Sequence, residues 1–146
     1  MQSVAPFHIV GISVETTNKD SQAMKDIGEL WSRFFDEQIF DKIPYKEDEN
    51  IYVVYTDYSS NYQGTYTALL GARVASLDYV PENMHGQSFS GGIFEKFVAK
   101  GDMPEALIDT WKKIWAMDDD LGRTYIYDFE VYTANAHEEI EIFIGV

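Results

Sequence analysis

One carboxylate in this chain is a candidate for chemistry because it lies among bulky apolar residues. Glu130 occupies the middle of Tyr127–Tyr132 (YDFEVY), a run with the composition of a β-strand. Burying a carboxylate is costly unless a partner compensates its charge, and a cationic ligand would be such a partner. Strand alternation puts Glu130 on the same face as Asp128 and Tyr132, and alternation alone favours solvent exposure of that face. Two interpretations are therefore open, a surface acid or the base of a ligand cleft.

Aromatic residues are abundant enough to build both a core and a ligand pocket. They make up 15% of the chain, with 10 Tyr, 9 Phe and 3 Trp. Each aromatic face near a bound cation would add an attraction of about 0.5–2 kcal/mol, so rings around Glu130 would strengthen a cation site. Trp111 and Trp115 lie four residues apart in a run with helical spacing, and that spacing by itself is typical of ordinary core.

The sequence has no convincing metal site. His8, His85 and His137 are scattered without the paired spacing of zinc ligands, and the chain has no cysteine. Asp118–Asp120 resembles the start of a calcium loop, but neither possible register supplies the remaining ligands. We expect this acidic run to be a solvated loop that follows a helix, and we expect no metal.

Motifs for nucleophilic catalysis and for phosphate-bearing cofactors also fail. Gly86–Ser90 (GQSFS) has serine where a nucleophile elbow needs its second glycine. Gly91 and Gly92 lack a phosphate-loop continuation and open a strand rather than a helix. Both segments are typical of turns, so the sequence predicts no catalytic residue and no cofactor.

Charge and hydropathy exclude several classes of partner. The 146 residues include 11 Lys+Arg and 25 Asp+Glu, which gives a net charge of −14. Nucleic-acid affinity comes mainly from Lys and Arg that neutralise phosphates, and no basic cluster or basic membrane-surface helix is present. No segment approaches the ~20 apolar residues of a membrane span, and the N-terminal residues lack the regions of a secretory signal. We expect a cytoplasmic protein that binds neither nucleic acid nor membrane directly.

The first half of the chain reads as strand, helix, strand, strand. Strands are predicted at Phe7–Thr16, Ile51–Asp57 and Thr65–Ser76, because these runs are rich in β-branched and aromatic residues. Apolar residues at spacings of three and four predict an amphipathic helix over Met24–Ile39.

The second half repeats this order. Strands are predicted at Gly91–Lys100, Tyr125–Thr133 and Glu139–Val146. Asp102 and Glu105 have the spacing of a capping box, which would start the helix between the first two of these strands. The apolar face of that helix carries Leu107, Trp111, Ile114 and Trp115.

Matching details indicate a true internal repeat. The pair Trp31 and Phe35 corresponds to Trp111 and Trp115, and YVVYTD at residues 52–57 corresponds to FEVYTA at residues 129–134. We therefore predict an α+β fold, a duplicated βαββ with pseudo-twofold symmetry, in which two helices pack on an antiparallel sheet and a cleft lies between the halves. One domain would span 1–146, with repeat 1 at about 6–76, a linker at 77–88 and repeat 2 at about 89–146.

Several segments occur in an order that is characteristic of a known family. They are Tyr66–Met84, Gly91–Gly101, Trp115 followed fifteen residues later by Glu130 in DFEVY, and the terminal EIEIFIGV. Their order and spacing resemble the GyrI-like small-molecule-binding domain, which is the effector-binding domain of AraC-type and multidrug-responsive transcription regulators. The resemblance covers essentially the whole chain and is particularly close to the stand-alone integron-cassette effector-binding proteins.

This resemblance implies a duplicated βαββ fold whose cleft binds lipophilic, often cationic, compounds. The family glutamate at the base of the cleft corresponds to Glu130, and the tryptophan near the end of the second helix corresponds to Trp115. The tyrosine of a family strand motif falls on Phe94, whose missing hydroxyl weakens any mechanism that needs a phenol there. Tyr55 and Tyr66 are further ligand-binding candidates, taken from the repeat rather than from a motif match.

In regulators this domain follows a helix-turn-helix module, and here the first predicted strand begins by Phe7, which leaves no room for one. We therefore expect a stand-alone effector-binding protein that binds lipophilic, cationic, aromatic small molecules in a central cleft with a buried glutamate. One alternative is a hydrolase of strained lipophilic electrophiles that uses Glu130 as a general base. Another is an acidic protein-interaction or inhibitor module. Binding without catalytic turnover is the favoured hypothesis.

Overall fold

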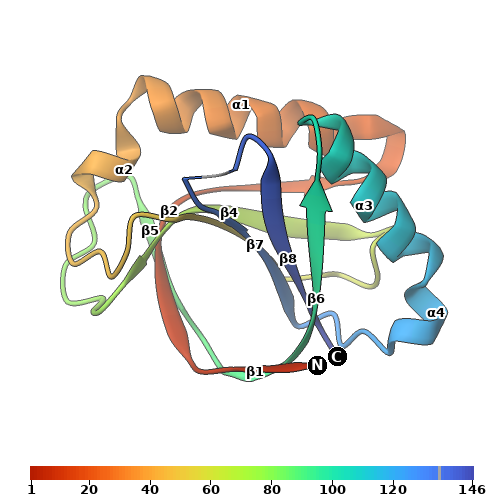
Figure 1. The fold of residues 1–146 in the computed structure, drawn as a ribbon. Coiled ribbons are helices and arrows are strands. Elements are labelled where there is room, and N and C mark those ends of the chain that lie inside the picture. Colours follow the sequence, from red (N-terminus) through yellow and green to blue (C-terminus); the bar gives the residue numbers. More distant parts are fainter. Residues whose placement is uncertain (135) are drawn as a thin grey trace.

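The computed structural model describes residues 1–134 and 136–146 of the chain. Its eight strands form one antiparallel sheet that curls strongly on itself (Figure 1). The strands are β1 (Gln2–Val4), β2 (Phe7–Thr17), β3 (Ile51–Thr56), β4 (Thr65–Val74), β5 (His85–Phe89), β6 (Gly92–Lys100), β7 (Tyr127–Tyr132) and β8 (Glu139–Gly145). Their order in the sheet is β1-β6-β8-β7-β3-β4-β2-β5, so β3 and β7 from the two halves of the chain pair at its centre.

Two longer helices, α1 (Gln22–Asp36) and α3 (Glu105–Ala116), cover the outer side of the curl (Figure 1). Helix α1 packs mainly on β2, and α3 packs mainly on β6. A short 3-10 turn at Lys19–Ser21 precedes α1, and the short helices α2 (Ile39–Lys42) and α4 (Asp118–Leu121) follow the two long ones. The mixed α and β composition and the antiparallel sheet agree with the sequence prediction.

The sheet is apolar on both faces. Its inner face holds a cluster that is rich in aromatic side chains, among them Phe7, Phe94 and Phe129. The outer face carries aliphatic clusters beneath α1 and beneath α3. A strand at the centre of such a sheet is buried on both sides, whatever the alternation of its residues.

Strand β7 is the clearest example of this double burial. Glu130 pairs with Val53 of β3 on one side and with Ile142 of β8 on the other. Val53 belongs to the cluster beneath α1, and Ile142 belongs to the cluster beneath α3. Glu130 therefore lies on the helix-covered face, and the solvent exposure that alternation alone favours is not observed.

The predicted first helix is divided in two. The helix expected over Met24–Ile39 ends at Asp36, because Gln38 adopts a left-handed conformation with φ of 53°, and α2 begins at Ile39. Apolar spacing could not indicate this break, since Ile39 stays in the same buried cluster as Phe34.

Two further predictions are wrong, and the structure adds a strand to the predicted linker. The capping box is wrong: α3 begins at Glu105 after Pro104 with no side-chain cap, and Asp102 instead accepts the Ala106 N–H through its backbone carbonyl. The segment assigned to a linker, 77–88, contributes most of strand β5. The acidic run at 118–120 forms α4 rather than a loop, and Asp118 pairs with Arg123 at 3.6 Å.

Candidate functional site

A cavity of about 720 Å³ lies between α1 and α3, above β3, β4 and β7. This volume is within the range typical of small-molecule sites. Its helical walls include Ala23, Met24, Ile27 and Gly28 from α1, and Leu107, Ile108, Trp111, Lys112 and Trp115 from α3. The sheet contributes Tyr55, Tyr66 and Glu130, and Tyr58 and Tyr62 come from the loop between β3 and β4.

Glu130 is the carboxylate of this cavity, and only 1% of it is exposed. The Trp111 indole N–H donates to its Oε2 at 2.6 Å, and the Tyr132 hydroxyl donates to its Oε1 at 2.7 Å. Tyr55 provides a third hydrogen bond from its hydroxyl. All three donors are uncharged, so they solvate the carboxylate without neutralising it.

Burial and hydrogen bonding act in opposite directions on the acidity of this group. Burial raises the pKa of Glu130, and the bonds from Tyr132, Trp111 and Tyr55 lower it, with burial the larger effect. Burial and the nearby Glu130 charge raise the pKa of Tyr55 and of Tyr132 well above the ordinary value of a phenol. These hydroxyls remain protonated donors throughout the neutral range.

A second buried carboxylate on the same strand has a very different environment. Asp128 is fully buried and binds the Arg123 guanidinium at 2.8 Å, the Tyr58 hydroxyl at 2.5 Å and the Gly145 N–H at 2.8 Å. Its charge is therefore neutralised within the protein. Within residues 1–134 and 136–146, no Lys, Arg or His forms an ion pair with Glu130.

Aromatic rings surround the carboxylate and form much of the cavity wall. Trp111 meets Tyr55 edge to face, with ring centroids 5.6 Å apart, and Tyr55 meets Tyr66 in the same manner at 5.7 Å. Further out, Tyr62 stacks on Trp115 at 5.8 Å with an angle of 8° between the ring planes. The arrangement provides several π faces around one uncompensated negative charge, which is an environment suited to an aromatic cation.

Four of the five predicted ligand-binding residues line this one cavity: Glu130, Trp115, Tyr66 and Tyr55. Phe94 does not line it. It is 2% exposed and lies in the cluster on the inner face of the sheet, with its ring centroid 5.2 Å from that of Tyr127 and 5.4 Å from that of Phe129. A motif alignment could match its position along the strand but could not indicate which face of the curled sheet borders the cavity.

Three residues that contact Glu130 or line the cavity were not among the residues predicted from the sequence. Trp111 was interpreted as ordinary core from its helical spacing, but its indole donates to Glu130. The alternation that grouped Tyr132 with Glu130 was a usable signal for the second donor. Tyr62 had no signal, because it lies in an irregular loop whose path depends on tertiary contacts.

Metal ligation and membrane spanning are two further properties that the structure bears on. Among the described residues, no group of three or more His, Asp or Glu side chains converges as metal ligands would. In the same part of the chain, none of the helices combines the length and apolar character that crossing a bilayer requires.

Comparison with known families and proteins places the chain in one family. The model of the Cass2 family, described as integron-associated effector binding protein, matches residues 2–146. The Vibrio cholerae integron cassette protein VCH_CASS2 is 30% identical to this chain, with a TM-score of 0.77 over 99% of this chain and 93% of that one. YobU of Bacillus subtilis, which is named as a transcriptional regulator, is 25% identical over 143 residues, or 93% of this chain and 89% of that protein.

A structure of SAV2435 bound to tetraphenylphosphonium has the same fold, with a TM-score of 0.80 and 18% identity over 99% of this chain and 91% of that one. These findings confirm the resemblance to integron-cassette effector-binding proteins that the sequence motifs indicated.

Proposed function

The chain belongs to the Cass2 family of integron-associated effector binding proteins, and from that premise we propose that it binds lipophilic aromatic cations. The proposed site is the cavity between α1 and α3, with Glu130 as the counter-charge of the ligand. The aromatic rings of Trp111, Tyr55 and Tyr66 would surround the apolar part of such a molecule.

The observation that carries this proposal is the contrast between two buried carboxylates. Asp128 has an arginine partner, whereas Glu130 has only neutral donors. At about 4 Å and an effective dielectric constant of about 20, opposite unit charges attract by ~4 kcal/mol before desolvation is subtracted. A cation that enters the cavity would gain much of this attraction, because the carboxylate is already desolvated.

The sheet pairing supports a central cleft between two repeats. In the sheet order, β6-β8-β7 is followed by β3-β4-β2, which is the same arrangement reversed. The repeat alignment equates Val53 with Glu130, and these two residues pair directly across β3 and β7. We propose a duplicated βαββ whose pseudo-twofold axis passes beside Glu130.

Two aromatic contacts support the same symmetry. The ring of Trp31 lies 4.9 Å from that of Tyr132, edge to face, and the ring of Trp111 lies 5.6 Å from that of Tyr55 in the same geometry. The repeat alignment relates Trp31 to Trp111 and Tyr132 to Tyr55. One donor to Glu130 thus comes from each of the two equivalent tyrosine positions.

The hydrogen bonds on Glu130 favour ligand anchoring over proton abstraction. A carboxylate has about four lone-pair directions, and Trp111, Tyr132 and Tyr55 together use three of them. A general base needs a free lone pair directed at its substrate or at a water molecule, and here about one remains, on a carboxylate that three donors hold in place. We therefore propose binding without turnover.

The test is isothermal titration calorimetry of the Glu130→Gln protein with tetraphenylphosphonium. We expect the affinity to fall by about tenfold to a hundredfold, because the substitution removes the charge but keeps the size of the side chain. Triphenylphosphine oxide, an uncharged aromatic compound, should lose far less. The Glu49→Gln protein is the matched control, because it makes the same charge change at an exposed position that does not line the cavity. An equal affinity of wild type and Glu130→Gln would reject the proposal.

A further inference from the structure

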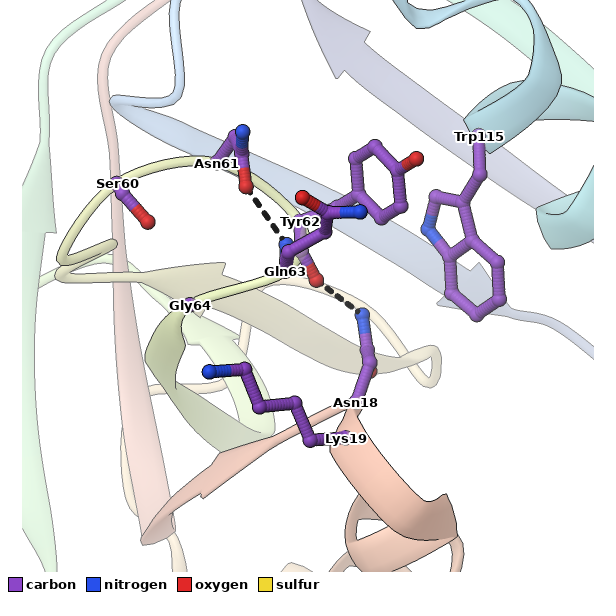
Figure 2. A pocket seen from close by; sticks show the side chains of 8 residues that line it. All are labelled: Asn18, Lys19, Ser60, Asn61, Tyr62, Gln63, Gly64 and Trp115. Atoms are coloured by element: carbon purple, nitrogen blue, oxygen red, sulfur yellow. Dashed lines mark hydrogen bonds between the residues drawn. The ribbon is translucent and has the colours of Figure 1, made fainter.

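A second cavity, of about 620 Å³, is shown in Figure 2. It shares lining residues with the cavity at Glu130, which we call the aromatic cavity. Asn18, Tyr62 and Trp115 line both cavities. The remaining lining of the second cavity is polar and comes from Lys19, Ser60, Asn61, Gln63 and the backbone at Gly64. We call it the polar cavity. It adjoins the aromatic cavity but differs from it in chemistry.

The spare hydrogen-bonding groups of the polar cavity are mainly donors. The Asn61 side-chain oxygen already accepts the Gln63 backbone N–H at 2.8 Å, which leaves the Asn61 amide NH₂ available. The Lys19 ammonium and the Gln63 side chain are exposed, and within the described part of the chain neither has a protein partner. These groups offer one ammonium and two amide NH₂ groups, against a single spare amide oxygen. A hydrogen-bond acceptor is therefore the complementary ligand group.

The wall between the two cavities is held in place by specific contacts. Tyr62 stacks in parallel on Trp115 (Figure 2), and both residues line both cavities. The Asn18 amide donates to the Tyr62 carbonyl oxygen at 2.9 Å, while its side-chain oxygen accepts the Tyr66 hydroxyl at 2.7 Å. Asn18 thus connects the loop that bears the polar groups to an aromatic wall residue of the other cavity, and the two cavities keep a defined relation.

We propose that the polar cavity is a second subsite, which binds a carboxylate or carbonyl arm of the ligand whose cationic part lies at Glu130. This inference rests on the proposed function and specifies its ligand class. The preferred ligand is an amphiphilic aromatic cation with an acceptor at the end of a flexible arm, and the Lys19 ammonium is the principal partner of that acceptor.

The overall negative charge of the protein would repel a carboxylate arm of the ligand. The chain has a net charge of −14, so its overall field disfavours a carboxylate. A measured preference for a carboxylate arm would therefore report local donors rather than the overall field of the protein.

The experiment compares three phosphonium cations by calorimetry. One is tetraphenylphosphonium, and the other two are triphenylphosphonium ions with alkyl chains of equal length, one ending in a methyl group and one in a carboxylate. We expect the carboxylate compound to bind wild type about twofold to fivefold more tightly than the methyl compound, since an ion pair with an exposed lysine such as Lys19 contributes modestly. The Lys19→Met protein should lose this preference and bind tetraphenylphosphonium as wild type does.

Two further variants complete the design. Gln63→Met removes an amide donor with little change in side-chain length and should reduce the preference in part. Lys42→Met is the charge control, because Lys42 is an exposed lysine on α2 that lines neither cavity, and it should keep the full preference.

The outcomes separate the two proposals. If tetraphenylphosphonium binds through Glu130 but the carboxylate arm gives no advantage, the polar subsite is rejected and the proposed function stands. If the advantage persists in both Lys19→Met and Gln63→Met, the assignment of these donors is overturned. If none of the three cations binds wild type, the proposed function fails and the subsite fails with it.

Discussion

Asp128 and Glu130 lie two residues apart on β7, and both are almost fully buried. Arg123 neutralises Asp128, whereas Trp111, Tyr132 and Tyr55 surround Glu130 with uncharged donors. A buried charge with one partner removed is expensive, so the neutral donors around Glu130 reduce that cost without removing the charge. The residue is suited to a counter-ion that comes from outside the protein.

The raised pKa of Glu130 predicts that cation binding depends on pH. Burial raises this pKa above its ordinary value of 4.5, and only the ionised form attracts a cation. We expect the affinity for tetraphenylphosphonium to fall as the pH is lowered through the raised pKa, starting at a higher pH than an exposed glutamate would. Calorimetry over a pH series measures this, and the Glu130→Gln protein should give a flat profile over the same range.

The raised pKa of Glu130 also makes stability depend on pH, and in the direction opposite to that of cation binding. A carboxyl group whose pKa is raised by folding contributes fully below the pKa of the unfolded chain, and that contribution is lost as the pH rises through the folded value. The unfolding free energy of wild type should therefore decline relative to that of Glu130→Gln over this interval. A constant difference between the two proteins across these pH values would contradict the pKa assignment.

At the scale of elements, strands β2 and β4 approach each other closely at a pair of glycines. Gly11 and Gly71 are directly paired, and a Cβ on Gly71 would lie 2.0 Å from the Val10 carbonyl oxygen. Glycine in a strand interior commonly marks such a close backbone approach. This contact lies in the most extensively paired part of the sheet, on which α1 rests.

Two alanine substitutions distinguish this contact from an unconstrained glycine. Gly71→Ala should lower the unfolding free energy by about 1–3 kcal/mol, because backbone atoms must move to admit the methyl group. Gly28→Ala in α1 meets no atom within 4 Å and should raise it by about 0.5–1 kcal/mol through helix propensity. Urea unfolding of both variants measures the difference, and equal effects of the two substitutions would contradict the close approach.

At the scale of the whole molecule, the inner face of the sheet carries core side chains, whereas the outer face carries both core clusters and the cavity. The inner face holds the aromatic cluster with Phe94 and Phe129, while the outer face holds the cavity with Glu130. Because β7 contributes to both, the same six-residue strand supplies core side chains and site side chains. Substitutions on the two faces should therefore have different consequences.

Phe94 and Trp111 provide the test of this separation. Phe94→Leu should lower the unfolding free energy by about 1–2 kcal/mol and leave the affinity for tetraphenylphosphonium unchanged. Trp111→Phe removes a donor to Glu130 and a cavity wall, so it should weaken binding measurably. Both quantities come from urea unfolding and calorimetry on the same samples. A clear loss of affinity in Phe94→Leu would place this residue in the binding machinery after all.

Much of the fold and part of the site could be predicted from the sequence alone. Period-two and period-3.6 patterns identified six of the strands and both long helices, since these patterns follow directly from backbone geometry. The motif order identified the family and selected Glu130 and Trp115, and the repeat suggested Tyr55 and Tyr66. All four line one cavity.

Only the tertiary structure decided what covers each face. Alternation groups Glu130 with Tyr132 but does not say that α1 and α3 bury that face, because burial depends on residues far away in the chain. The same limit explains why Phe94, which the motif alignment selected, lies on the inner side of a curl that no local pattern encodes and does not line the cavity. The loop contact of Tyr62 with Trp115 and the donor role of Trp111 likewise depend on packing between distant elements. The sequence by itself determined which side chains were available for the proposed cation site, and the curl of the sheet determined which of them surround Glu130.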